Sequence, residues 1–427
     1  MTRSLLHLFR LEHIRHFMTL FSSSVLGQLL TLALAPVLSR MFLPDDFGLA
    51  ALYLGILSVI GVVSTGKYEQ AIMLPREDTA AVHIFRLVLL LAGVASAISL
   101  MVVLIFNNDI AAALGNPLIS LWLYLLPLSL LIHAAHQAAL FYSNRTKKFN
   151  RIAKTTLIQQ VSTNGIKVGA GALQFSLNGL IIGQIAGHFL SMLFVLVNTI
   201  KQIRKVNVPL SLTAIKQQAR IYAQYPRFNM LLSLTNNISG SLPIFLFTRG
   251  FSAEAAGLYA FGYAFVFRPL SLFSQSTQQV LSQKMIENHH HGKAIYPTLK
   301  KLISRLLLAG LIPFTLVTIW APNIFAFVFS EAYGPAGQYL QILSPWLFMV
   351  LLTSPLTFLH ELYFKQKTAM IIDIVYLVLR FFALMTGIWL NDITVALVLF
   401  SGSGALVVGY KMLWYMQLAR KGDKNKI

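Results

Sequence analysis

Three basic side chains lie inside long apolar runs of the sequence: Lys167, Arg268 and Arg380. An ionisable group within hydrocarbon is costly unless it is paired or hydrated, so each is a candidate functional residue. A planar guanidinium can bind phosphate oxygens through two parallel hydrogen bonds, and this favours anion binding at Arg268. The alternative for Arg268 is hydrogen bonding to backbone carbonyls that the adjacent Pro269 leaves free. For Arg380, a second phosphate site and pairing with another helix are equally favoured.

A polar face accompanies Lys167. Gln160, Thr163, Asn164 and Lys167 have the spacing i, i+3, i+4, i+7, which places them on one side of a helix. Within a bilayer, such a face looks onto a water-filled cavity or onto other helices. Asn164 and Lys167 are therefore candidate cavity residues; the alternatives are helix–helix packing and a lysine that snorkels outward to the membrane surface.

A second polar face combines amides and aromatic rings. Asn229, Ser233, Asn236 and Asn237 share one side of an apolar run, and Tyr263 lies in the following run. We expect Asn236, Asn237 and Tyr263 to bind a ligand by hydrogen bonds and ring stacking. Packing between helices is an equally good interpretation.

Acidic residues are few, and two of them are candidates for gating or ion coupling. Glu69 lies in GKYEQAIMLPRED (66–78); we expect the preceding helix to continue past Thr65, with Lys67 and Glu69 in its last turn. Pairing of Glu69 with Lys67 or Arg76, which would order the loop, is favoured over a gate. Asp373 lies two turns from Arg380, about 10 Å away and too far for a direct bridge, so a local structural partner is favoured for it.

The elements that carry these residues must be membrane helices. The chain has 427 residues, of which 56% are hydrophobic and only 11% charged, against about a quarter charged in soluble proteins. A span needs roughly 20 apolar residues. Twelve runs qualify: 17–39, 48–65, 84–106, 118–141, 156–174, 178–200, 229–248, 257–282, 303–328, 338–360, 368–389 and 394–417.

The formal charge of +20 reflects topology. Of 34 Lys and Arg residues, 29 lie on the side of the N-terminus, three lie within spans, and only Arg40 and Arg249 fall on the opposite side. Because loops rich in Lys and Arg stay in the cytoplasm, both termini are predicted to be cytoplasmic. This distribution also argues against nucleic-acid binding.

The sequence contains an internal repeat. SRMFLPDDFGLAALY (39–53) resembles TRGFSAEAAGLYAFG (248–262), with Arg40 on Arg249 after a shift of 209 residues. Six spans separate the copies, so both halves have the same orientation, as in transporters with parallel repeats. The predicted fold is all-α and polytopic, with about twelve transmembrane helices in two pseudo-symmetric six-helix lobes around a central cavity. We expect an N-terminal lobe at 1–200, a cytoplasmic connection at 201–228 and a C-terminal lobe at 229–427.

These residues resemble a known family. The turn LSRMFLPDDFGLAALY followed by TGKYEQAIMLP, with FGYAFVFRPLSLF in the eighth span, is similar to the Wzx-type oligosaccharide flippases. These form the polysaccharide-transporter branch of the multidrug/oligosaccharidyl-lipid/polysaccharide superfamily. The resemblance covers the whole chain.

The resemblance implies a function and a location. The expected activity is translocation of polyprenyl-pyrophosphate-linked oligosaccharide by alternating access, from the cytoplasmic to the periplasmic leaflet of the bacterial inner membrane. It would feed O-antigen (lipopolysaccharide), capsule or exopolysaccharide assembly. Membrane lipids, a polysaccharide polymerase and the chain-length machinery are implied partners. Arg268 would then bind the pyrophosphate, and the polar faces would meet the sugar. A monomer is expected, because two lobes supply both sides of the cavity.

Two other classes of protein fit less well. A cation-coupled drug antiporter of the same superfamily would need carboxylates in the N-terminal lobe, where the spans have none. A membrane enzyme such as an oligosaccharide polymerase would need a large outward loop, and the longest predicted one is about Asn107–Pro117. The sequence has no P-loop, G-x-S-x-G or HExxH motif and no cysteine. We therefore expect neither an enzyme nor a cofactor or metal site.

Overall fold

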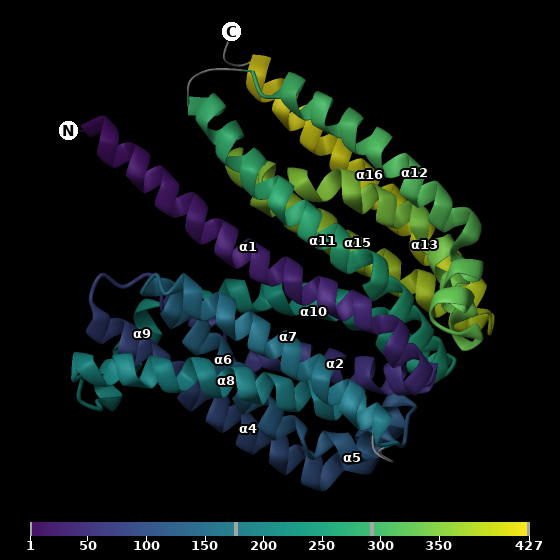
Figure 1. Cartoon of the computed structure of the whole chain (residues 1–427), viewed down its shortest axis with the longest axis horizontal. Helices are drawn as coiled ribbons and strands as arrows, with labels where there is room; N and C mark the ends of the chain where they lie inside the picture. Colours follow the sequence, from purple (N-terminus) through teal and green to yellow (C-terminus); the bar gives the residue numbers. More distant parts are fainter. Residues whose placement is uncertain (1, 175–177, 291–293, 425–427) are drawn as a thin grey trace. The chain divides into compact units, whose positions relative to one another are not determined.

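The computed structural model describes residues 2–174, 178–290 and 294–424; for residues 2–20, 279–280, 283–284, 286, 289–290 and 424 only the backbone is described. The chain divides into two compact units at Ser241 and Leu242, inside one helix (Figure 1). The predicted lobe boundaries at 200 and 228 stay a prediction.

Unit 1 is all-helical in its described part. Side chains of Asn178 and Ser211 cap two of its helices by accepting backbone N–H hydrogen bonds. The elements are α1 (Thr2–Met41), α2 (Pro44–Thr65), α3 (Tyr68–Ala71), α4 (Asp78–Leu114), α5 (Ile119–Leu123), α6 (Leu126–Arg145), α7 (Phe149–Ala172), α8 (Gly179–Val206), α9 (Leu212–Ile221), a π-helical turn (Tyr225–Asn229) and the first part of α10 (Met230–Gly250).

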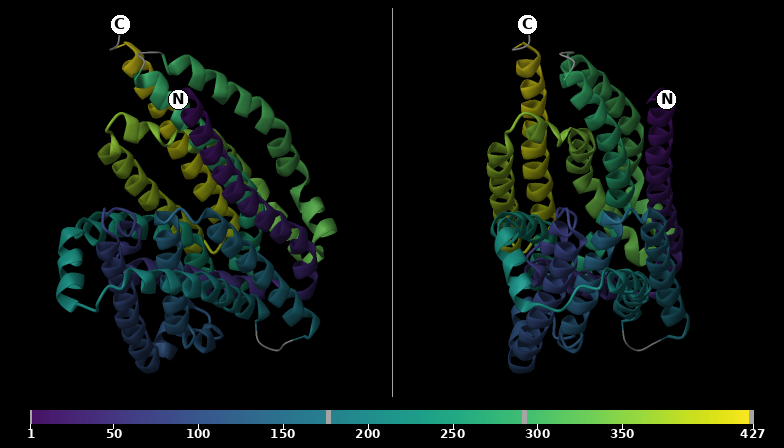
Figure 2. Two further views of the ribbon diagram at one scale, coloured as in Figure 1. Left: turned by 60° about the vertical axis from the view of Figure 1, so that its left-hand side comes forward. Right: turned by 90° about the vertical axis from the view of Figure 1, so that its left-hand side faces the viewer.

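Unit 2 is likewise helical in its described part. It contains the remainder of α10, α11 (Ala253–His290), α12 (Tyr296–Val328), a 3-10 turn (Glu331–Tyr333), α13 (Gly334–Thr353), a second 3-10 turn (Ser354–Leu356), α14 (Leu359–Leu362), α15 (Gln366–Trp389) and α16 (Ile393–Lys424). Figure 2 shows the helices from two further sides.

Each of the twelve predicted spans overlaps mainly with helix, although the spans at 118–141 and 338–360 are interrupted by turns. Ten described segments are long and apolar enough to cross a bilayer. α6 and α7 fall outside this set, because polar residues lower their hydropathy: α6 carries His133 and His136, and α7 carries the polar face that includes Lys167. The chain is therefore an all-α, multi-pass membrane protein.

The internal repeat predicted from the sequence appears as two corresponding sets of helices, each paired in the same way. With the same shift of 209 residues, the end of α1 at Met41 corresponds to the end of α10 at Gly250, and the start of α2 at Pro44 to that of α11 at Ala253. The helix pairs α2·α6, α4·α6, α6·α8 and α7·α8 in unit 1 correspond to α11·α13, α12·α13, α13·α16 and α15·α16 in unit 2.

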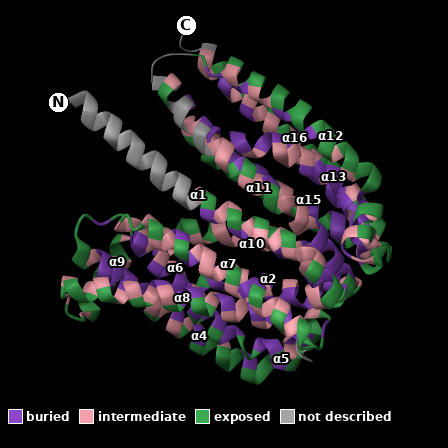
Figure 3. Ribbon diagram, viewed as in Figure 1, coloured by how far each residue is buried: buried purple, intermediate pink, exposed green. Residues whose placement is uncertain are grey.

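Each unit contains a hydrophobic cluster near the side that is predicted to be cytoplasmic, and the two clusters correspond in the repeat. In unit 1, Ile72 is buried with residues of α4, α6, α8 and α9, including Phe85 and Tyr142. In unit 2, its repeat partner Leu281 is buried with residues that include Tyr415. Figure 3 shows how buried positions alternate with exposed ones along the outer helices, as expected for faces turned to lipid.

Three local expectations are wrong. α2 ends at Thr65, because Gly66 and Lys67 both take left-handed backbone angles, with φ of 57° and 61°, so Glu69 lies in the separate helix α3. α4 continues through a kink at Phe106 to Leu114, so most of the predicted loop at 107–117 is helical. The predicted span at 118–141 is divided between α5 and α6, just before Pro127.

Candidate functional site

The segment at 66–78 is held in place by one arginine of α6. Arg145 donates hydrogen bonds to the carbonyl oxygens of Ile72, Pro75 and Arg76, and its Nη2 lies 2.9 Å from Oδ1 of Asp78. The Arg145 side chain is 11% exposed, whereas that of Asp78 is 60% exposed. Because water weakens an exposed ion pair, the bonds to the carbonyls are the stronger restraint on the segment.

Glu69 is buried beside Lys67. Its side chain is 5% exposed, and Oε1 lies 3.6 Å from Nζ of Lys67. The second carboxylate oxygen is buried with no hydrogen-bond partner among the described residues. Burial raises the pKa of the neighbouring Tyr68 hydroxyl, which donates to the carbonyl of Ala219 in α9. The Lys67 contact supports pairing for Glu69, and its gate role stays a prediction.

The polar face of α7 contacts two other helices of unit 1. Asn164 is buried and donates to Oγ1 of Thr31 in α1 at 3.0 Å, while Thr31 donates to Gln160. Nζ of Lys167 lies 3.4 Å from Oε1 of Gln184 in α8. The face thus links α1, α7 and α8 in this conformation, which supports the packing interpretation.

The two asparagines of α10 have different surroundings. Asn237 is half-buried and donates to the carbonyl of Ser58 in α2 at 3.0 Å. Asn236 is exposed. Of the two, Asn236 is therefore the residue whose amide is accessible to a ligand.

Arg268 lies in the middle of α11 with its side chain exposed. In the described part of the chain, no hydrogen bond or ion pair of its guanidinium is found, and its backbone carbonyl accepts a bond from Ser271. α11 runs on through Pro269 without interruption. The side chain is therefore accessible, and its anion-binding role stays a prediction.

Arg380 and Tyr263 belong to one aromatic cluster of unit 2. The guanidinium carbon of Arg380 lies 4.9 Å from the ring centroid of Trp346, 4.7 Å from that of Tyr376 and 4.3 Å from that of Phe400. Tyr263 stacks on Trp346 with centroids 5.8 Å apart. Arg380 is 7% exposed, so a phosphate would have to displace these rings to reach it.

Asp373 forms an ion pair with the neighbouring helix. Its Oδ1 lies 2.6 Å from Nζ of Lys411, which joins α15 to α16. The pair matches the local partner favoured from the sequence, and the gating role of Asp373 stays a prediction.

Sequence analysis did not single out a histidine cluster in unit 1. Nε2 of His188 lies 3.0 Å from Nε2 of Gln159, and its Nδ1 lies 3.2 Å from Nε2 of Gln184. The rings of His136 and His188 are 5.7 Å apart and steeply inclined, and Nε2 of His136 is buried without a partner among the described residues. A small cavity beside them is lined by residues that include Tyr53, Ser129 and His133.

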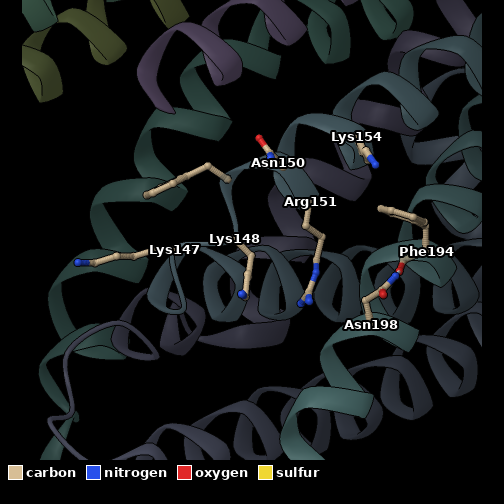
Figure 4. Close-up of a pocket in the computed structure, with 8 residues that line it drawn as sticks. Lys147, Lys148, Asn150, Arg151, Lys154, Phe194 and Asn198 are labelled. Atoms are coloured by element: carbon tan, nitrogen blue, oxygen red, sulfur yellow. The ribbon is translucent and has the colours of Figure 1, made fainter. Parts of the chain in front are cut away.

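A basic pocket at the start of α7 is the second group that sequence analysis missed (Figure 4). It has a volume of about 470 Å³ and no carboxylate in its lining. The residues that line it are Lys147, Lys148, Phe149, Asn150, Arg151, Lys154, Phe194 and Asn198.

Two repeated sets of membrane helices with these pairings resemble the fold of solved membrane transporters, among them members of the multidrug/oligosaccharidyl-lipid/polysaccharide (MOP) superfamily. An inward-facing multidrug resistance MATE family transporter of this superfamily matches with a TM-score of 0.68 and 12% identity, covering 93% of this chain and 96% of the other. The lipid II flippase MurJ, in an inward closed conformation, matches with a TM-score of 0.71 and 14% identity, covering 97% and 90%. At such identities the likeness concerns the fold.

The sequence itself identifies a family within this class. Residues 37–306, more than half of the chain, match the family described as polysaccharide biosynthesis protein, and the chain belongs to that family. A comparison with curated proteins gave no match.

Proposed function

We propose that this protein is a flippase for polyprenyl-pyrophosphate-linked oligosaccharides, moving them from the cytoplasmic to the periplasmic leaflet of the bacterial inner membrane. The observation that carries the proposal is membership of a polysaccharide biosynthesis family in a chain with a transporter fold. A lipid carrier must cross the bilayer when its sugar is assembled on one side and used on the other. The products served would be O-antigen, capsule or exopolysaccharide, with the polymerase and chain-length machinery as partners.

The exposed cation of α11 supports an anionic substrate. The Arg268 guanidinium would bind the pyrophosphate, since its planar fork matches phosphate oxygens. The accessible amide of Asn236 would hydrogen bond to sugar hydroxyls. Arg380 and Tyr263 would take part in substrate binding only in a conformation that opens the aromatic cluster.

The alternative, a cation-coupled antiporter, has weaker support. It shares the fold, as the MATE match shows. However, the six predicted spans of the N-terminal half contain no Asp or Glu, whereas they do contain Arg86, Lys167 and several histidines. Such an interior suits an anionic substrate better than a cationic drug.

The leaflet that holds the lipid-linked oligosaccharide tests the proposal. In cells that lack the protein, the lipid-linked precursor should accumulate in the cytoplasmic leaflet, and the wild-type protein should restore export. Arg268→Ala should reduce export strongly and Arg268→Lys partially, whereas Ser271→Ala, one turn away, should restore it. Full export with Arg268→Ala would exclude the phosphate role of this residue. A leaflet distribution that never depends on the protein would exclude the flippase function.

A further inference from the structure

We propose that the basic pocket at the start of α7 binds the phosphate of an anionic lipid headgroup. Its volume of about 470 Å³ lies within the usual range of ligand pockets, about 300–1,000 Å³. It is built entirely within unit 1, from the α6–α7 connection, the first turns of α7 and one stretch of α8.

The charge of the pocket selects an anion. Lys147, Lys148 and Lys154 are exposed and Arg151 is half-buried, and the lining contains no carboxylate to neutralise them. Figure 4 shows Lys148 and Arg151 extending in the same direction from the start of α7. Nη1 of Arg151 donates to Oε1 of Gln202 in α8 at 3.2 Å, which fixes the guanidinium in place. A fixed guanidinium among exposed ammonium groups is a suitable arrangement for phosphate oxygens.

The level of the pocket favours a lipid over a soluble anion. Phe194 and Asn198 lie near the end of the predicted span at 178–200, while residues 147–154 precede the predicted span at 156–174. The pocket therefore crosses the boundary at which headgroup phosphates lie, on the side predicted to be cytoplasmic. The rings of Phe149 and Phe194 give it an apolar wall, and basic pockets between helices on this side of a membrane commonly bind anionic headgroups.

Headgroup binding at this pocket is independent of the transported molecule, because neither Arg268 nor any other proposed substrate residue lines it. A binding experiment on the purified full-length protein can therefore fail without affecting the flippase proposal, and the reverse also holds.

The experiment measures binding of short-chain phosphatidylglycerol to the detergent-solubilised protein, with short-chain phosphatidylcholine and inorganic pyrophosphate as separate probes. The test variant is Lys148→Gln/Lys154→Gln, since both side chains are exposed and the fold should not depend on them. The matched control is Lys300→Gln/Lys301→Gln, two exposed lysines at the start of α12. Each cation near an anionic lipid contributes about fivefold in affinity, so the test variant should bind phosphatidylglycerol about 25-fold more weakly.

The outcomes separate the sources of the phosphate. Loss of phosphatidylglycerol binding in the test variant alone, with weak binding of phosphatidylcholine and pyrophosphate to the wild type, supports a lipid headgroup. Equally tight pyrophosphate binding that the test variant also loses supports a phosphate site but overturns the assignment to a lipid. An unchanged affinity in the test variant, or an equal loss in the control, overturns the pocket itself.

Discussion

At the scale of single residues, the backbone of the segment at 66–78 is ordered by the largely buried Arg145 more than by the ion pair that this arginine forms with Asp78. Arg145 and Asp78 form a short ion pair, yet Asp78 is mostly in water. Arg145 also donates hydrogen bonds to the carbonyl oxygens of Ile72, Pro75 and Arg76. The loop at 66–78 is therefore stabilised mainly by the hydrogen-bonding capacity of one guanidinium.

This difference can be measured with two substitutions. Arg145→Ala should destabilise unit 1 by about 2–3 kcal/mol, since hydrogen bonds from a charged donor are lost. Asp78→Asn should cost less than about 1 kcal/mol, as expected for an exposed pair. Thermal unfolding and protease cleavage within the loop would report both effects, and an equal cost for the two variants would contradict the assignment.

A second residue-scale prediction concerns Asp373 and Lys411. Lys411→Met alone should destabilise the contact between α15 and α16, because it leaves Asp373 without this partner. Asp373→Asn in the same chain should recover part of the loss, with a coupling energy of about 1 kcal/mol for a partly exposed pair. A double variant that regains stability but transports poorly would instead support the gating role of Asp373.

Individual residues also show how far the sequence alone could lead. The linear sequence is enough to detect a charge within an apolar run, and it therefore identified Arg268, Lys167 and Arg380. The histidine cluster joins His136 of α6 to His188 of α8. These residues are 52 positions apart in the sequence, and only helix packing brings them together. The signal for it was nevertheless present, as ionisable side chains inside two predicted spans. From the sequence, the residues of the basic pocket are recognisable only as charges in a predicted loop, because the concave shape that they form in the structure has no sequence signature.

At the scale of elements, the close approach of α7 and α8 depends on glycine. A methyl group added at Gly187 would lie 2.7 Å from Cα of Thr163, whereas one added at Gly169 would have no heavy atom of another element within 4 Å. Small residues spaced by four are typical of such tight membrane-helix contacts.

Two alanine substitutions test this contact. Gly187→Ala should destabilise the protein by about 1–3 kcal/mol, because the helices must separate to admit the methyl group. Gly169→Ala should leave stability unchanged or raise it by up to about 1 kcal/mol through helix propensity. Thermal unfolding in detergent would separate the two, and the contact would be misassigned if Gly187→Ala were harmless.

Element ends show both the success and the limit of sequence reasoning. The repeat correctly relates the helix ends at Met41 and Gly250, because the same turn follows both helices. It fails at Gly66 and Lys67, where two consecutive left-handed residues end α2, while α11 continues through the corresponding positions, Gln275 and Ser276. A single sequence offers no reason for a lysine to adopt that conformation, since the cost is borne by surrounding contacts.

At the scale of the whole molecule, the distribution of cations predicts a topology that can be tested directly. The chain has no cysteine, so single cysteines can be introduced without a background. In spheroplasts, a membrane-impermeant maleimide should label the exposed position in Leu118→Cys, and should label Lys216→Cys only after permeabilisation. Labelling in the reverse order would place the termini on the outer side.

α11 is long enough to extend out of the bilayer into water. Its 38 residues extend for about 57 Å, well beyond the roughly 30 Å of a hydrocarbon layer, whereas the 22 residues of α2 extend for only about 33 Å. Because the backbone of α11 is helical throughout, a small tilt of its membrane-embedded half is amplified at its far end. A spin label at Glu287, an exposed position near that end, would therefore report in water on movements that occur within the bilayer.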